Sequence, residues 1–178
     1  TPGITLFPYT TLFRSRRAHA VCPVTAVQNR YSMMARQNEV LFPVLEELNI
    51  GFVPFSPMAN GFLTGKYDKN SKFDPKTDYR SMMPQFKEEA YEQNKKLLQL
   101  LWDMASEKNA TPAQISLAWM ICKKDYISPI PGTTKLVRLK ENAKAADIQL
   151  TKEEIKNLDE ALSSIKMSEV FGGTKIVK

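Results

Sequence analysis

The segment ISPIPGTTKLVRLKEN, residues 127–142, decides how the rest of this sequence is interpreted. It begins with a short apolar run, breaks at Pro131-Gly132, and continues through small and basic side chains into a helix-forming stretch. This order predicts a strand, a tight turn and the start of a helix. Backbone N–H groups are free at a helix N-terminus, which makes that position favourable for binding a phosphate.

Charged and polar side chains follow the turn at helical spacing. Arg138 falls on roughly the same helical face as Lys135, and Glu141 and Asn142 come one turn later. A guanidinium and an ammonium beside hydroxyls suit a phosphate, whereas a carboxylate and a carboxamide suit the edge of a purine. From spacing alone, a surface loop with solvated charges is an equally good interpretation.

This stretch resembles the cofactor-adenosine motif of the aldo-keto reductase family. That motif runs from Pro-Gly or Pro-Lys at the end of the last barrel strand, through Thr or Ser, to an Arg and then Glu-Asn, and every one of these positions is filled here. The resemblance implies contacts to the 2′-phosphate of NADP from Thr133, Thr134 and Arg138, and contacts to its adenine from Glu141 and Asn142.

One position departs from the family's pattern. Many members have a Lys where this chain has Gly132, so the resemblance leaves one phosphate contact without its usual side chain. Lys135, three residues further along, is a candidate to replace that contact.

Composition excludes several classes of protein. With 178 residues, 43% apolar and 25% charged, the chain has the make-up of a soluble globular protein. The net charge of +6 is scattered along helical segments where Lys and Arg accompany Glu, apart from a cluster at Arg14, Arg16 and Arg17. We therefore expect no nucleic-acid partner. No apolar run approaches the length of a membrane span, and we expect no membrane partner.

The cysteine and histidine residues form no catalytic or metal-binding pattern. Cys22 and Cys122 lie far apart in apolar surroundings without metal-ligand spacing, and we interpret both as reduced core thiols of a cytoplasmic protein. His19 is the only histidine. It stands in a helical context without a plausible partner nearby, which favours a surface position over a catalytic one.

The first fifteen residues differ from the rest. The segment 5–15, TLFPYTTLFRS, has neither helical nor strand periodicity and lacks the basic start of a signal peptide. Through all eleven residues it resembles the conceptual translation of a widely used sequencing-library adapter. We therefore expect residues 1–15 to be non-native and residues 16–178 to be part of a barrel domain entered in the middle of a longer coding sequence. A disordered N-terminal tail is the alternative.

A strand is predicted at residues 24–31, VTAVQNRY, from its β-branched content and length, after a helix that ends at Cys22-Pro23. Gln28 lies near the C-terminal end of this strand, the end that faces the active site in a parallel barrel. The segment AVQNRYS resembles the sixth barrel strand of the family, which implies that Gln28 binds the nicotinamide carboxamide. A buried Gln satisfied by neighbouring backbone is the alternative.

A helix and a second strand follow. The helix starts at Asn38 and Glu39, with Pro43 able to delay it, and the strand is IGFVPF at residues 50–55. The order of strand, helix and strand demands a right-handed crossover and a parallel sheet. The next loop, SPMANGFLTGKY, resembles the family's loop after the seventh strand, where backbone amides approach a pyrophosphate. The cofactor-binding candidates in this loop are Ser56, Pro57, Met58, Gly61 and Lys66.

Phe55 ends that second strand. It occupies the position of a family aromatic residue that stacks on the nicotinamide, and a core Phe at a strand end is the plain alternative. The polar segment 67–84 is long for a loop in a compact domain, and by resemblance we expect a lid over the cofactor.

The remaining sequence predicts helices. Residues 85–109 are expected to form one long amphipathic helix. Thr111-Pro112-Ala113-Gln114 and Thr151 with Glu154 are capping boxes that start a deeply packed helix and an outer helix. We expect the tail from Met167 to be mobile.

Three βα units result, and three cannot close a barrel. Since an eight-stranded barrel needs about 250 residues, we predict an α/β fold that is the C-terminal portion of a (β/α)8 TIM barrel. It would hold about strands six to eight with their helices, plus an extra C-terminal helix.

The resemblance implies that the whole protein is an NADP(H)-dependent oxidoreductase that reduces a small-molecule carbonyl substrate, an aldehyde or ketone, to an alcohol. In the family, the catalytic Asp, Tyr, Lys and His come from the first strands, so we assign no catalytic residue here. None of the five tyrosines considered has a matching Lys and Asp context: Tyr31, Tyr67, Tyr79, Tyr91 and Tyr126. We expect no reductase activity from this chain alone.

Two other functions remain open. Potassium-channel β-subunits resemble the same motifs, so a nucleotide-sensing regulatory protein is the alternative. A barrel-like fold that binds another phosphorylated ligand is the third possibility.

Overall fold

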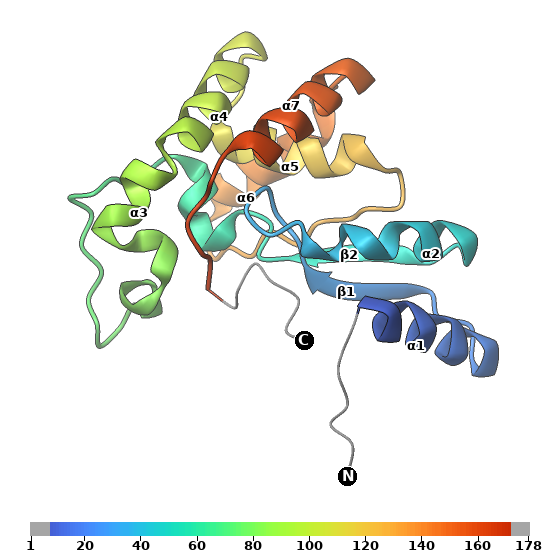
Figure 1. Ribbon diagram of the computed structural model, residues 1–178. Coiled ribbons are helices and arrows are strands. Elements are labelled where there is room, and N and C mark those ends of the chain that lie inside the picture. Colours follow the sequence, from blue (N-terminus) through green and yellow to red (C-terminus); the bar gives the residue numbers. More distant parts are fainter. Residues whose placement is uncertain (1–7, 172–178) are drawn as a thin grey trace.

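The computed structural model describes residues 8–171, and Figure 1 shows helices gathered over one face of a small sheet. The elements in chain order are α1 (Pro8–Val21), β1 (Ala26–Arg30), η1 (Gln37–Leu41), α2 (Phe42–Glu47), β2 (Gly51–Phe55), η2 (Ala59–Thr64), η3 (Tyr79–Met82), η4 (Pro84–Phe86), α3 (Glu88–Gln93), α4 (Lys95–Glu107), α5 (Pro112–Lys123), α6 (Leu136–Ala143), η5 (Lys144–Asp147) and α7 (Lys152–Ser164). Here η denotes a 3-10 helix.

The two predicted strands pair in parallel, as the crossover argument requires. β1 and β2 place Gln28 opposite Val53. The third predicted strand lies on the other side of β2 but is reduced to a single bridge between Phe52 and Ile127. Its backbone still follows β2, because the Ile130 N–H donates to the Pro54 carbonyl at 3.0 Å. Prolines at 129 and 131 lack the donors that a longer ladder would need.

The two faces of this sheet differ in burial. Phe52 and Pro54 point to the helix side and are buried, whereas Gln28, Val53 and Phe55 alternate to the other face. Gln28 is exposed there. The residues predicted to face a cofactor therefore share the sheet face that the helices leave open.

Helix α5 lies at the centre of the core. Both reciprocal bonds of its predicted capping box are present: the Gln114 N–H donates to Thr111 Oγ1 at 3.3 Å, and the Thr111 N–H donates to Gln114 Oε1 at 2.9 Å. Trp119 from this helix is fully buried. The second predicted capping box, Thr151 with Glu154, starts α7 in the same way.

The long helix predicted over residues 85–109 is wrong. The chain instead forms η4, α3 and α4, with the break between α3 and α4 at Asn94. Asn94 is fully buried and bonds a distant segment: its Nδ2 donates to Ser168 Oγ at 2.7 Å, and its Oδ1 accepts the Ser168 N–H at 3.0 Å. The Asn94 backbone keeps its own bonds, from its N–H to the Ala90 carbonyl at 2.9 Å and from the Leu98 N–H to its carbonyl at 3.0 Å, so the break is a local turn at this residue.

The same bonds correct the prediction of a mobile tail. Ser168 and Val170 are buried, so residues 167–171 pack on the helices. Residues 172–178, the rest of that predicted tail, lie outside the described segment.

The N-terminal helix is longer than the sequence predicted. α1 ends at Val21, before Cys22-Pro23 as expected, but it begins at Pro8, within the stretch that shows no periodicity. The Arg16 guanidinium pairs with the Glu47 carboxylate, which ties α1 to α2. Residues 1–7 of the segment predicted to be non-native lie outside the described residues.

Two local predictions change, and a third is confirmed. Cys22 is exposed and is not a core thiol, whereas Cys122 is partly buried. Asn38 does not cap a helix, because its Nδ2 donates to the Arg30 carbonyl at 2.8 Å. Pro43 does delay the helix, and α2 begins only at Phe42.

Candidate functional site

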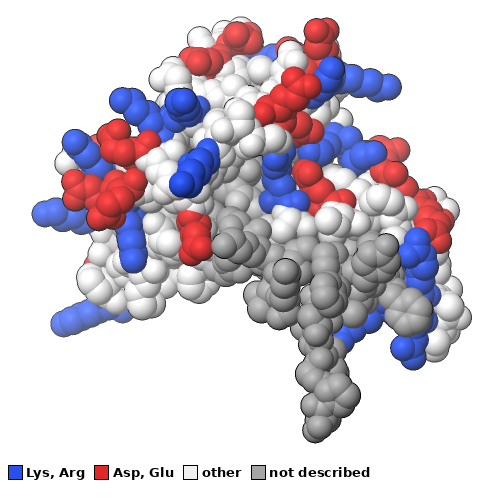
Figure 2. Space-filling view, viewed as in Figure 1, with Lys and Arg blue, Asp and Glu red and all other residues white. Residues whose placement is uncertain are grey.

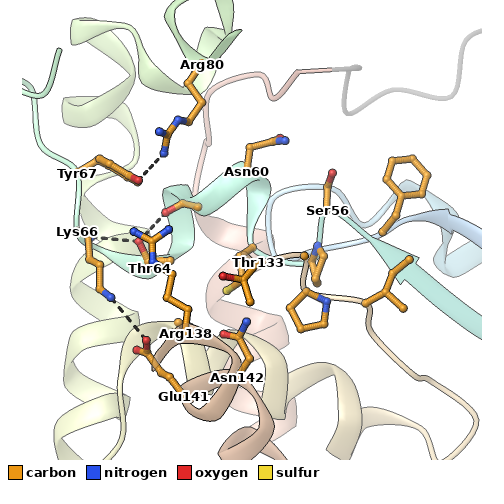
Figure 3. A pocket seen from close by; sticks show the side chains of 18 of the residues that line it. Ser56, Asn60, Thr64, Lys66, Tyr67, Arg80, Thr133, Arg138, Glu141 and Asn142 are labelled. Atoms are coloured by element: carbon orange, nitrogen blue, oxygen red, sulfur yellow. Dashed lines mark hydrogen bonds and ion pairs between the residues drawn. The ribbon is translucent and has the colours of Figure 1, made fainter. Parts of the chain in front are cut away.

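A cleft of ≈ 380 Å³ opens beside the C-terminal end of β2. Its walls come from η2, from the 67–84 segment, and from the turn and helix that follow Ile130, as Figure 3 shows. It contains most of the predicted site residues: Phe55, Ser56, Pro57, Met58, Gly61, Lys66, Gly132, Thr133, Arg138, Glu141 and Asn142. Gln28, Thr134 and Lys135 do not line it.

The predicted free helix end is present at α6. Its first intrahelical bond runs from the Leu139 N–H to the Lys135 carbonyl at 3.0 Å, so the N–H groups of 136–138 have no helical partner. Thr133 Oγ1 accepts the Lys135 N–H at 3.1 Å, which fixes the turn before the helix. Unpaired N–H groups beside a hydroxyl form a suitable cradle for an anion.

Arg138 projects from α6 towards the middle of the cleft, near Thr64 and Thr133 (Figure 3). It is exposed and forms no hydrogen bond or ion pair with another residue of the described chain. A guanidinium in a cleft without a carboxylate partner retains all its donors for a ligand. Asn142, one turn further on, is buried at the floor of the same cleft.

Glu141 joins the two sides of the cleft. Its Oε2 lies 3.6 Å from Lys66 Nζ, across from the end of the η2 loop. Its backbone carbonyl accepts Gln114 Nε2 at 2.9 Å, so α5 holds this turn of α6 in place. The Glu141 backbone is therefore held by α5, and its carboxylate is attracted to Lys66 on the opposite wall of the cleft.

Gly132 lines the cleft, whereas Lys135, the candidate to replace the missing contact, does not. A Cβ at Gly132 would meet no atom within 4 Å, so the Lys that many members have would fit there. Lys135 is exposed and lies outside the cleft.

The loop after β2 has an unusual backbone. Ser56, Ala59 and Asn60 adopt positive φ angles of 51°, 48° and 60°, followed by Gly61 at 96°. Small residues tolerate such angles best, and the turn is closed by its own bonds: the Ala59 and Gly61 N–H groups donate to the Ser56 and Met58 carbonyls at 3.0 and 2.9 Å. Helix α5 supports this loop, because Ser116 Oγ donates to the Pro57 carbonyl at 3.5 Å.

Phe55 lies in the cleft and Gln28 does not, although both side chains belong to the open face of the sheet. The Arg30 guanidinium lies 5.2 Å from the centre of the Phe55 ring. Burial lowers the pKa of Arg30 below its ordinary value. Phe55 and Arg138 share one cavity, which is the arrangement that a dinucleotide spanning strand end and helix would need.

Arg80 is a residue of the cleft that the sequence did not predict. It lines the cleft from the 67–84 segment, packs 4.9 Å and 4.6 Å from the ring centres of Tyr67 and Phe73, and donates to the Tyr67 hydroxyl. Its Nε donates to both carboxylate oxygens of Asp78, at 2.9 and 3.0 Å. This bonding raises the pKa of Arg80 and lowers that of Asp78. The sequence signal for Arg80 was an Asp two residues before it, Asp78, in a segment that also holds aromatic residues.

One tyrosine does have a lysine and carboxylates nearby, contrary to expectation. We call this group the Lys123 network: Tyr31, Glu39, Trp119, Lys123 and Asp159. The Tyr31 hydroxyl donates to Glu39 Oε1 at 2.7 Å, and Lys123 Nζ donates to Glu39 and to Asp159, each at 2.8 Å.

The Lys123 network does not have the properties of a proton-donating site. Tyr31 is fully buried, lies outside the cleft, and has its pKa raised well above the ordinary value, chiefly by burial. A catalytic tyrosine needs the opposite shift. We assign no catalytic role to this network.

Comparison with known proteins agrees with the motif in α6. The chain matches the sequence profile of the Aldo/keto reductase family over residues 3–163. The chain belongs to the aldo-keto reductase family. "Probable aldo-keto reductase 1" from Glycine max is 36% identical over 159 residues, which are 89% of this chain and 44% of that protein.

Two solved structures resemble this member of the family in fold. The glycerol dehydrogenase AKR11B4 from Gluconobacter oxydans has a TM-score of 0.77 at 19% identity, covering 93% of this chain and 48% of the other. The thermostable aldo-keto reductase Tm1743, with the inhibitor epalrestat, has a TM-score of 0.58 at 23% identity, covering 82% and 43%. This aldo-keto reductase chain thus spans somewhat under half the length of the relatives it matches.

The described residues also bear on metal binding and membrane crossing. Residues 8–171 contain no group of three or more His, Cys, Asp or Glu side chains placed to hold a metal ion. In the same residues, no helix combines the length and apolar character that crossing a membrane requires.

Proposed function

We propose that this chain forms the adenosine and phosphate portion of an NADP(H) site in an oxidoreductase that reduces aldehydes or ketones to alcohols. The observation that carries this proposal is the unpaired Arg138 guanidinium in a cleft shared with Thr133, Asn142 and Phe55. Because this guanidinium bonds no carboxylate within residues 8–171, its donors are available to an anionic ligand in the cleft.

The groups in the cleft fit the parts of the cofactor. Arg138, Thr133 and the free N–H groups of α6 suit a 2′-phosphate, and Glu141 and Asn142 suit the edge of an adenine. Lys66, at the end of the loop after β2, suits a pyrophosphate.

Phe55 offers a ring for the nicotinamide. When bound, NADPH supplies the hydride, and the chain's own residues hold and orient it. The predicted contacts from Gln28, Thr134 and Lys135 gain no support from the cleft.

The finer assignments of fold and setting are also part of this proposal. We place the chain at about strands six to eight of a (β/α)8 barrel, in which β1, β2 and the strand at Ile127 would be consecutive. A cytoplasmic location and a small-molecule carbonyl substrate accompany the reductase assignment.

The regulatory alternative gains no specific support. The relatives reported above are described as aldo-keto reductases and a glycerol dehydrogenase, and this favours redox chemistry over nucleotide sensing.

Titration with NADPH and NADH tests the proposal, with binding followed by nicotinamide fluorescence. We expect NADPH to bind at least about tenfold more tightly, because a buried or partly buried phosphate–guanidinium pair contributes about 1.4 kcal/mol or more. Equal affinity for the two would contradict the 2′-phosphate role. Absence of binding to either would contradict a dinucleotide site.

A further inference from the structure

Gln85 connects two segments that lie far apart in the sequence. Its side chain is fully buried. Its Nε2 donates to the Ala59 carbonyl at 3.3 Å, and its Oε1 accepts the Phe171 N–H at 2.9 Å. A carbonyl only accepts and an N–H only donates, so these two partners fix the orientation of the amide.

The first of these segments has a demanding backbone. Ala59 has φ 48° without being a glycine, and it precedes Asn60 and Gly61, which also have positive φ and line the cleft. A non-glycine residue in this region is strained, so the surrounding structure must hold it there. The hydrogen bond from Gln85 fixes the backbone at Ala59, the first of these three consecutive positive-φ residues.

The second segment, residues 167–171, is the C-terminal strap. It is fixed at several points, since Ser168 is bonded on two atoms by Asn94 and Val170 is buried. The strap therefore gives Gln85 a firm support on the side away from the cleft.

We infer that Gln85 is a positioning residue for the cleft. It transmits the docking of the C-terminal strap to the backbone at Ala59, and thereby sets how Asn60 and Gly61 meet a dinucleotide phosphate. This inference rests on the proposed function, because it assumes that a dinucleotide is what the loop meets.

Replacement of Gln85 by Leu tests the coupling, because it removes both bonds and keeps the approximate size. We expect the NADPH dissociation constant to rise about fivefold, the effect of one lost hydrogen bond. Gln93→Leu is the matched control. Gln93 also donates to the strap, at the Met167 carbonyl and 3.1 Å, but it is exposed and makes no bond to η2, so its dissociation constant should not change.

Gln85→Glu adds a second measurement, the pH dependence of NADPH affinity. A purely structural role for Gln85 would not produce such a dependence. A protonated carboxyl can still donate to Ala59 and accept from Phe171, whereas a carboxylate cannot donate. The bonds of Gln85 go only to Ala59, Phe171 and the Met83 sulfur, so within residues 8–171 no titratable group bonds it. Affinity should be near normal at low pH and fall as pH rises through the burial-raised pKa of the new carboxyl.

The results separate this inference from the proposed function. If the unchanged protein binds NADPH and both Gln85 variants bind it equally well at all pH values, the inference is overturned and the proposed function stands. The same holds if the variants are less stable but the folded fraction binds normally. If the unchanged protein does not bind NADPH, the proposed function itself fails.

Discussion

The cleft and the Lys123 network both combine cationic side chains with carboxylates and tyrosines, but they use their charges in opposite ways. Lys123 is only 12% exposed, bonds two carboxylates, and lies 4.5 Å from the centre of the Trp119 ring. In the cleft, Arg138 has no partner among the described residues, and Lys66, 52% exposed, has one at 3.6 Å. A satisfied cluster stabilises the fold, whereas donors left unpaired in a cleft are available to a ligand.

Figure 2 shows charged side chains of both signs spread over the viewed face. Blue and red side chains alternate over the outer helices, and no single-sign patch dominates that view. Such solvated pairs contribute little to stability, so net charge alone identifies neither region.

The largest expected effect is on stability, from Lys123→Met. Removing the ammonium leaves Glu39 and Asp159 without their shared partner. Their side chains are 32% and 30% exposed, so water compensates in part, and we expect a loss of about 2–3 kcal/mol in the free energy of unfolding. Urea denaturation followed by circular dichroism measures it, and the NADPH affinity of the folded protein should stay within about twofold.

Lys156→Met is the control for this comparison. Lys156 pairs with Glu160 at 3.8 Å on the surface of α7 and is 73% exposed, so its removal should cost less than about 0.5 kcal/mol. An equal cost for the two substitutions would show that the Lys123 network is not a stabilising cluster.

Arg80→Lys tests an intermediate case, since Arg80 is both paired with Asp78 and part of the cleft wall. Lysine keeps the charge but loses the fork and the packing on Tyr67 and Phe73. We expect about 1 kcal/mol less stability and about threefold weaker NADPH binding. A loss of stability alone would make Arg80 purely structural, and a loss of affinity alone would make it purely a ligand contact.

The direction of the Asp78 pKa shift determines how the stability of the Arg80–Asp78 pair depends on pH. Arg80 holds the pKa of Asp78 below its ordinary value, so the pair's stabilisation is fully present above that ordinary value and is lost as pH falls through the lowered pKa. The stability difference between Arg80→Lys and the unchanged protein should therefore be constant between about pH 6 and about pH 8. A difference that varied across this range would mean that another group titrates with the pair.

The comparison also explains what the sequence could predict. The motif around Arg138 and the two capping boxes are local patterns, with all their residues within a few turns. Both capping boxes form, and the motif lines the cleft except at Thr134 and Lys135. The Lys123 network joins residues from four separate segments, which no spacing rule links. Asn94 and Gln85 were missed for the same reason, because their partners are 74 and 86 residues away.

The central claim is that Arg138 reads a 2′-phosphate, and adenosine 2′,5′-bisphosphate against adenosine 5′-monophosphate tests it most directly. Calorimetric titration of the unchanged protein should show a preference of about tenfold or more for the bisphosphate. In Arg138→Met that preference should nearly disappear, while the free energy of unfolding stays within about 0.5 kcal/mol because the Arg138 side chain has no partner within residues 8–171 to lose. A variant that kept the full preference would contradict the account.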